Sequence, residues 1–231
     1  MTIHSSPDLL KKIWILGGGK FGQLALKRIR HHLPRVKITL VDSRPDIAVE
    51  EGVTVVHEDG ISWLAENLQR EGTADMVIPS LPVHMVAEWL KVKGGKRWRI
   101  SAVPLPDDLV AILPHPLRNG DSRLYISHAD FLCPDNCGEP ELICTYTGRE
   151  REENLFDLVG RLDFPPFTPL VIRSYQLLPG VGGIYPEDMW DLLDNLPGLS
   201  GRFLLITTAC RCHGVVDGLR FEMKGEEDTN C

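Results

Sequence analysis

The sequence predicts an α/β protein in which a parallel-sheet domain is followed by a second, smaller α/β domain that carries the cysteines. Short apolar runs alternate with stretches of helical periodicity through the first half, and a glycine-rich turn separates the first two. All six cysteines lie beyond residue 132. A proline-rich passage at 104–119 is the expected domain boundary, which gives domains of residues 1–115 and 116–231.

The first apolar run, 13–16, enters the turn GGGKFG at 17–22, and a helical stretch follows. A second apolar run at 36–41 ends at Asp42, twenty residues after the last glycine of the turn. In a Rossmann βαβ unit, such glycines permit a tight turn, let the backbone approach a pyrophosphate and let the helix pack on the strand. The helix N–H groups hold the phosphates, and the acidic residue holds a ribose diol. We therefore predict a Rossmann-like dinucleotide site formed by Gly17, Gly19, Lys20, Phe21, Gly22 and Asp42.

The sequence leaves the identity of the dinucleotide open. The negative charge of Asp42 favours NAD(H), because it would repel the 2′-phosphate of NADP(H), whereas Arg44 offsets that charge. Lys20 is expected to contact a phosphate. The alternative interpretation is a glycine turn that binds no ligand, and the strand before it, the helix after it and Asp42 all argue against that alternative.

Further strands are predicted at 53–56, 75–79 and 98–103, with helical stretches over 61–68 and 83–90 between them. The alternation predicts a parallel sheet with helices on both faces. Four polar residues should follow the carboxyl ends of strands, where open α/β sheets bind ligands: His57, Asp59, Ser80 and His84. We interpret His84 as a surface histidine in preference to a proton donor.

Residues 12–90 resemble the Rossmann domains of bacterial potassium-uptake regulatory subunits. The matching segments are ILGGGKFG, LVDSRPD, EEGVTVVHEDG and ADMVIPS. The resemblance implies that the glycine loop holds phosphates, that Asp42 holds the ribose, and that Asp59 lies near the adenine. It covers less than half of the chain and supports nucleotide binding more than potassium regulation.

In the second half, strands are expected at 124–127, 142–146, 170–178 and 203–208, and helices at 150–162 and after Pro186. A further glycine-rich stretch at 180–183 precedes the last helix. Because Glu187 and Asp188 would repel an anion there, we predict a turn without a phosphate. The final residues, GEEDTNC, are expected to fray.

The cysteines form two groups. Cys133 and Cys137 are a C-x3-C pair followed by Cys144, and Cys210 and Cys212 are a C-x-C pair followed by His213. In a reducing cytosol, such groups are usually metal or redox sites. Because each close pair can chelate from one turn, we predict a metal site with a minimal set of four ligands. The set is Cys133, Cys137, Cys210 and Cys212, with Cys144 or His213 as alternates.

Donors in excess of four suit zinc with an additional reactive thiol, or an iron–sulfur cluster with a variant ligand. Redox thiols without a metal, and buried cysteines that pack as small hydrophobic side chains, are the alternatives. Cys144 lies within a predicted strand and fits the buried alternative best. Cys231 is expected to take no part.

Composition limits the class of protein. The chain is 43% hydrophobic and 25% charged. No apolar run reaches the roughly twenty residues that cross a bilayer, and the segment MTIHSSPDLLKK lacks the apolar core of a signal peptide. We expect a cytoplasmic protein without membrane insertion. From Pro116 onward there are ten Lys/Arg and nineteen Asp/Glu, a net charge of −9, so the remainder of the −7 chain carries +2. The acidic second half argues against a nucleic-acid partner.

Two functional classes follow from these observations. The first is an oxidoreductase in which NAD(P) exchanges electrons with a substrate or with a metal–thiolate centre, and thiolates beside a redox cofactor favour it. The second, implied by the resemblance to potassium-uptake regulatory subunits, is a non-catalytic nucleotide-sensing regulatory subunit that acts on a partner. The sequence leaves open the substrate, the catalytic residues and whether the chain forms a homo-oligomer.

Overall fold

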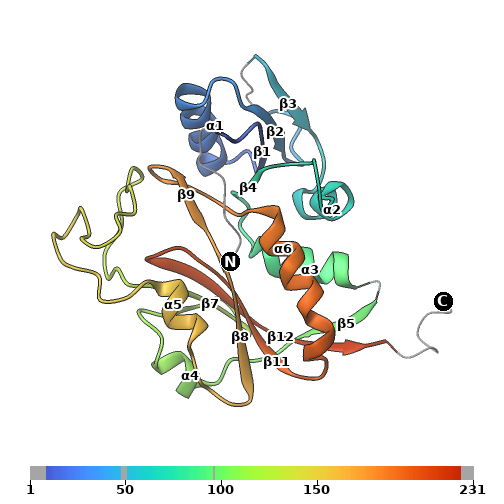
Figure 1. The fold of residues 1–231 in the computed structure, drawn as a ribbon, viewed down its shortest axis with the longest axis vertical. Helices are drawn as coiled ribbons and strands as arrows, with labels where there is room; N and C mark the ends of the chain where they lie inside the picture. The colour runs from blue at the N-terminus through green and yellow to red at the C-terminus, as the bar shows by residue number, and fades with distance from the viewer. Residues whose placement is uncertain (1–8, 48–50, 96, 225–231) are drawn as a thin grey trace.

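The computed structural model describes residues 9–47, 51–95 and 97–224 and has a mixed α/β architecture built on two main sheets. The first sheet is parallel, has the strand order β3-β2-β1-β4, and lies above the second in Figure 1. Its strands are β1 (Lys12–Leu16), β2 (Lys37–Val41), β3 (Val53–Val56) and β4 (Met76–Pro79), and its helices are α1 (Lys20–His32) and α2 (Gly60–Asn67). These elements confirm the α/β class and the sequence-based positions of the four strands. The tail GEEDTNC and Cys231 lie outside the described residues.

The second sheet is mixed, with β8 and β11 parallel and the other pairs antiparallel. Its order is β6-β7-β12-β11-β8, and β5 pairs with the far half of the long strand β12. The strands are β5 (Trp98–Ala102), β6 (Leu117–Arg118), β7 (Arg123–Ser127), β8 (Phe167–Arg173), β11 (Phe203–Ala209) and β12 (His213–Met223). A separate two-stranded sheet is formed by β9 (Tyr175–Leu178) and β10 (Val181–Gly183).

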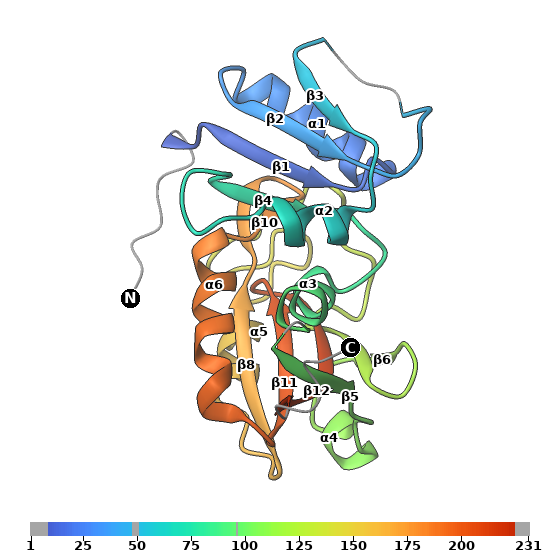
Figure 2. The ribbon, with the colours of Figure 1, turned by 90° about the vertical axis from the view of Figure 1, so that its right-hand side faces the viewer.

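Helices cover both faces of the second sheet (Figure 2). The helices α3 (Met85–Gly94) and α6 (Pro186–Asn195) pack on one face, and α4 (Asp107–Ala111) and α5 (Leu155–Gly160) pack on the other. A 3-10 turn, η2 (Leu196–Leu199), follows α6. Both faces of the second sheet are apolar and need a cover, because successive side chains of a strand point to opposite faces. In β11, Leu204 and Ile206 belong to the cluster under α3 and α6, whereas Leu205 belongs to the cluster under α4 and α5. Within the described residues, no helix is long and apolar enough to cross a membrane.

The strand predicted at 98–103 is present, but it does not extend the first sheet. It becomes β5 and pairs antiparallel with β12. Apolar periodicity identifies a strand without identifying its partner, and α3 carries the chain away from β4 before β5 begins. The chain therefore passes from the first sheet to the second between β4 and β5, ahead of residue 115 where we expected the boundary.

Other corrections concern the second half. The predicted strand at 142–146 is a turn with one isolated bridge, and the helix at 150–162 is reduced to α5. The predicted strand at 170–178 is divided between β8 and β9. Strand β12 was not predicted, because two glycines and a buried aspartate interrupt its apolar pattern. His84 was expected at the surface, whereas this side chain is buried.

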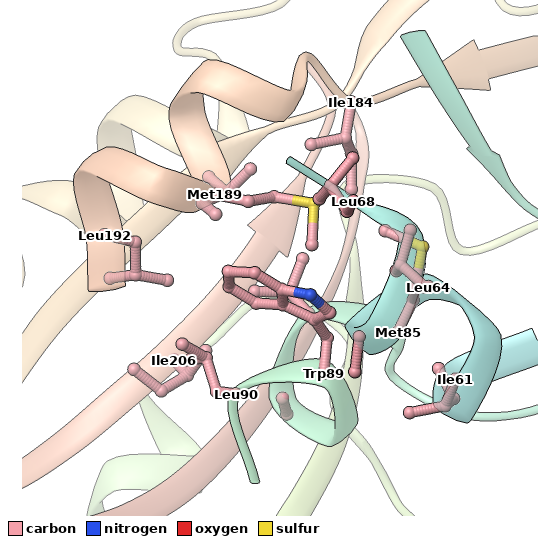
Figure 3. Close-up of a cluster of buried hydrophobic side chains, with 14 of the residues drawn as sticks. Ile61, Leu64, Leu68, Met85, Trp89, Leu90, Ile184, Met189, Leu192 and Ile206 are labelled. Atoms are coloured by element: carbon pink, nitrogen blue, oxygen red, sulfur yellow. The ribbon is translucent and has the colours of Figure 1, made fainter. Parts of the chain in front are cut away.

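The two sheets share one apolar core, in which Trp89 of α3 occupies the centre (Figure 3). Trp89 is fully buried and meets the ring of Trp190 edge to face, with 5.4 Å between the centroids. Leu64 of α2, beside the first sheet, and Ile206 of β11, in the second, belong to the same cluster. Below the edge strand β4, Ile184 exchanges two backbone hydrogen bonds of 2.9 Å with Val77. The core thus fixes the first sheet on the second.

A buried polar network holds α3 on the second sheet. His84, at the start of α3, donates from Nδ1 to Asp217 of β12 at 2.6 Å, and its Nε2 lies 2.8 Å from the hydroxyl of Thr208. The guanidinium of Arg123 binds both Asp217 oxygens and also Glu88. Burial alone would raise the pKa of Asp217, but these hydrogen bonds outweigh it and hold that pKa below its ordinary value. Burial lowers the pKa of His84 despite the carboxylate beside it, so this imidazole is neutral.

Replacing Asp217 should destabilise the fold. The variant Asp217→Ala leaves Arg123 and His84 buried without their partner, and we expect the free energy of unfolding to fall by about 3–5 kcal/mol. Urea denaturation measures this loss. The control is Asp194→Ala, which breaks the half-exposed pair with Arg70 and should leave the midpoint nearly unchanged. Equal midpoints for the two variants would show that the network has no special role.

The pKa of His84 also predicts a pH dependence. Below the ordinary histidine pKa of about 6.5, the unfolded chain binds a proton that folded His84 does not, so stability should fall as the pH drops below that value. Thermal melting between pH 8 and pH 5 measures this dependence. The variant His84→Gln keeps a donor for Asp217 and should show a shallower acid decline than the parent. Parallel curves would assign the decline to other groups.

Candidate functional site

The glycine loop joins β1 to α1 and leaves no room for side chains at two of its positions. Gly17 has a φ of +97°, and a Cβ there would meet the carbonyl oxygen of Ser80 at 2.5 Å. A Cβ at Gly22 would overlap the carbonyl of Gly17, since α1 begins directly against the turn. These two glycines are therefore required by the packing of the chain itself.

Gly19 differs from both. Its φ of −70° is available to any residue, and a Cβ built on it would meet no atom within 4 Å. Gly19 is also the N-cap of α1, where it offers no side-chain acceptor, and the first turn of this helix contains no acidic residue. Helix α6, by contrast, carries Glu187 and Asp188 in its first turn. These two carboxylates are the reason why no phosphate site was predicted there. The start of α1 is thus open, uncapped and positive in its dipole.

Asp42 lies beside this loop and is 9% exposed. Its carboxylate accepts the Gly18 N–H at 2.6 Å and the Arg44 N–H at 2.9 Å, and the Arg44 guanidinium spans both oxygens at 3.0 Å. Hydrogen bonding by the Arg44 side chain, and then by the two N–H groups, lowers the pKa of Asp42 to about 2 despite partial burial. The carboxylate is therefore ionised at neutral pH, and a ribose diol can approach it only in place of the guanidinium.

Three other residues of the predicted nucleotide site have contacts of their own. Asp59 caps α2 by accepting the Ser62 N–H at 2.8 Å. The ammonium of Lys20 lies 3.8 Å from the carboxylate of Asp135. Phe21 is 61% exposed and faces the long connection that carries the first three cysteines.

A cavity of about 470 Å³ lies between this connection, helix α1 and the turn from β11 to β12. The connection runs from β7 to α5 and forms the yellow and green loops at the left of Figure 1. Phe21 and Leu24 of α1 form part of the wall. The sequence-predicted metal ligands line the same cavity: Cys133, Cys137, Cys144, Cys210, Cys212 and His213. The structure therefore brings together two groups of cysteines that are far apart in the sequence.

The five cysteines are free thiols, and a network centred on Arg151 joins their two segments. Arg151 donates to the carbonyls of Pro140 and Glu141, at 2.8 and 2.9 Å, and to Cys212 Sγ at 3.0 Å. A second link is formed where the side chain of Glu139 accepts the N–H of Arg211. Within the described residues, no three His, Cys, Asp or Glu side chains are arranged to hold a single metal ion.

The thiols differ in their surroundings. Burial, and then the neighbouring thiols Cys137, Cys212 and Cys144, raise the pKa of Cys133. Burial raises the pKa of Cys210 to about 12. Hydrogen bonds from Thr147 lower the pKa of Cys144, which lies in a turn and does not fit the buried strand position that the sequence suggested.

Sequence reasoning missed several polar residues of the cavity wall. They are His115, His128, Glu139, Arg149 and Arg151. His128 precedes the first cysteine, and its Nε2 is buried without a hydrogen-bond partner among the described residues. Burial lowers the pKa of His128, so a neutral imidazole faces the cavity. Most of these residues are close to Cys133–Cys144 in the sequence, and this was the only indication that they share a site with the thiols. No fixed spacing between them and the cysteines marks such a site.

The fold and the site define a two-sheet α/β protein with an open glycine-rich loop beside a thiol-lined cavity. Residues 82–222 match the family described as an uncharacterized protein, C-terminal domain (AF_1314_C); since the match spans more than half of the chain, the chain belongs to this family. The matched region begins after β4, where the chain passes to the second sheet.

An uncharacterized protein of Archaeoglobus fulgidus is 27% identical over 226 residues, which cover 89% of this chain and 98% of that protein. The similarity thus extends through both sheets. No solved structure matches the chain.

Proposed function

We propose that this chain is a dinucleotide-binding protein of the Rossmann type and an oxidoreductase that uses NAD(H) or NADP(H) beside the thiol cavity. One observation carries the proposal. The helix that opens from the glycine loop also forms a wall of the cavity, through Phe21 and Leu24. A dinucleotide at the start of α1 would therefore lie next to the thiol-lined cavity.

Several features of the loop support dinucleotide binding. The strand order β3-β2-β1-β4 is the order of a dinucleotide-binding half, in which the glycine loop follows the central strand. Gly19 has no structural reason to be glycine, whereas the approach of a pyrophosphate would supply one. Asp42 is ionised and lies at the end of β2, where a ribose diol is recognised. Arg44 would have to leave Asp42 for NAD(H), and its guanidinium would be available to a 2′-phosphate.

The proposed chemistry requires a two-electron acceptor. A dihydronicotinamide gives up a hydride, which carries two electrons, and an organic acceptor such as a quinone takes the hydride together with one proton from the solvent. The cavity, at about 470 Å³, has the size of a small-molecule site and is lined by apolar, acidic, cationic and thiol groups.

A nucleotide sensor is the second candidate, and one set of contacts favours it. Helix α1 is tied to the cysteine-bearing connection by the pair between Lys20 and Asp135 and by Arg28, which donates to the carbonyls of Asp135 and Pro179 at 2.6 and 2.7 Å. A shift of α1 on nucleotide binding would thus be passed to the cavity without any turnover.

The glycine loop provides a specific test of binding. We expect Gly19→Ala to weaken the binding of NADH or NADPH at least about tenfold, which corresponds to about 1.4 kcal/mol, because the new methyl group occupies the space left for the pyrophosphate. Isothermal titration calorimetry measures this change. The matched control is Gly198→Ala, at another glycine with open space and an unstrained φ, and it should bind like the parent. Absence of binding by the parent to NAD(H), NADP(H), ATP and AMP refutes the proposal.

Turnover separates the two candidates. An oxidoreductase should oxidise NADH or NADPH in the presence of a soluble quinone, followed by the loss of dihydronicotinamide absorption. The Gly19→Ala variant should lose this activity together with its binding. A parent protein that binds the dinucleotide and shows no oxidation with quinones or ferricyanide would be a sensor.

A further inference from the structure

Five thiols line the cavity, and one of them, Cys210, accepts hydrogen bonds within its own turn. The other four are Cys133, Cys137, Cys144 and Cys212. Three of these residues come from the connection between β7 and α5, and the fourth comes from the turn between β11 and β12. Arg151 holds the two segments together by bonding Cys212 Sγ and the carbonyls of Pro140 and Glu141.

We propose that Cys133, Cys137, Cys144 and Cys212 ligate an iron–sulfur cluster of the four-cysteine type in this cavity. The inference deepens the proposed function, because it identifies the metal–thiolate centre beside the dinucleotide loop, and it rests on that function for the role of the cluster. The assignment differs from the minimal set expected from the sequence, since Cys144 takes the place of Cys210.

The geometry favours a cluster over a single ion. Zinc holds thiolates at about 2.3 Å, which requires the sulfurs to converge on one point. Among the described residues no such convergence of three donors exists, and the thiols instead surround a cavity of about 470 Å³. A [4Fe–4S] cluster binds each of its four thiolates through a different iron and therefore spaces the sulfurs more widely than one ion does.

Two of the sulfurs accept hydrogen bonds of the kind that stabilise an anionic cluster, although the cavity wall also carries Glu139 and Glu150. Cys212 Sγ accepts a charge-assisted hydrogen bond from Arg151 at 3.0 Å, and Cys137 Sγ accepts the N–H of Glu139 at 3.4 Å. Hydrogen bonds of this kind compensate the charge of cluster thiolates and set their potential.

Cys210 serves the turn from β11 to β12. Its N–H donates to the carbonyl of His213 at 2.9 Å, and its Sγ accepts the N–H groups of Cys212 and His213 at 3.4 and 3.3 Å. Cys210 therefore has a structural partner set without a metal.

The connection that carries three of the proposed ligands has little regular secondary structure of its own. Residues 128–154 form neither helix nor regular strand, and only the bridge between Ile143 and Glu150 resembles a ladder. Apolar side chains on this connection are exposed, with Leu132 at 94% and Leu142 at 62%. A structureless connection of this length inside a compact fold is usually functional, and a bound cluster would order it as metals order other small domains.

The test uses the full chain, purified without oxygen and reconstituted with ferrous iron and inorganic sulfide. We expect about four irons and four acid-labile sulfides per chain, with broad visible absorption that dithionite bleaches. Cys144→Ser should lose most of the iron and sulfide, whereas Cys210→Ser should retain the parent's content. Circular dichroism establishes that both variants are folded, and Cys137→Ser provides a second ligand variant.

Several outcomes would overturn the inference. They are a protein that stays free of metal, a protein that takes up one zinc without sulfide, and retention of iron by Cys144→Ser with loss by Cys210→Ser. Calorimetry with NADH on the reconstituted parent separates this inference from the proposed function. A cluster without dinucleotide binding leaves the cluster assignment standing and removes the proposed function, and dinucleotide binding without a cluster does the reverse.

Discussion

The site depends on a contact that excludes side chains. Gly22 lies against the carbonyl of Gly17, and Gly17 lies against that of Ser80, so that helix α1 can begin only in one position at the end of β1. Because this position is fixed, the exposed side of α1 presents Phe21, Leu24 and Arg28 toward the cysteine-bearing connection. A small packing constraint in the first sheet thereby sets one wall of a cavity whose thiols belong to segments around the second sheet.

The second sheet depends on a different constraint, which is the burial of charge. Asp217 is 2% exposed in the long strand β12, and it is tolerable there because His84 and Arg123 satisfy both of its oxygens. The network specifies which face of β12 meets α3, since a shift of one residue would turn the carboxylate to the opposite face, among the apolar side chains under α4 and α5. His84 follows the segment that closes the glycine loop, so the two constraints lie only a few residues apart along the chain.

Local patterns were enough to predict the first sheet. The strands β1 to β4 are short apolar runs bounded by turns, and the spacing of the glycines in the loop predicts the tight turn before α1. Strand β12 was not predicted because Asp217 interrupts its apolar pattern. This aspartate can be buried only through partners that lie 94 and 133 residues away in the chain. The convergence of the thiols was expected, but the residues that organise it were not. Arg151 binds backbone carbonyl groups, which every residue has, so no sequence pattern marks its role.

The shared wall has a thermodynamic consequence. If a dinucleotide at the glycine loop changes the position of α1, the affinity of the thiol cavity for its own ligand must change by a factor that is the same in both directions. Under the proposed function, Lys20 would link the two sites in charge as well as in shape, because its ammonium lies beside Asp135 on the cysteine-bearing connection and would also be near a phosphate at the glycine loop. A phosphate that drew Lys20 away would release one hold on that connection, while Arg28 would keep the other. Under the proposed function, occupancy of one site would therefore be felt at the other through α1, whether the protein turned over a dinucleotide or only sensed it.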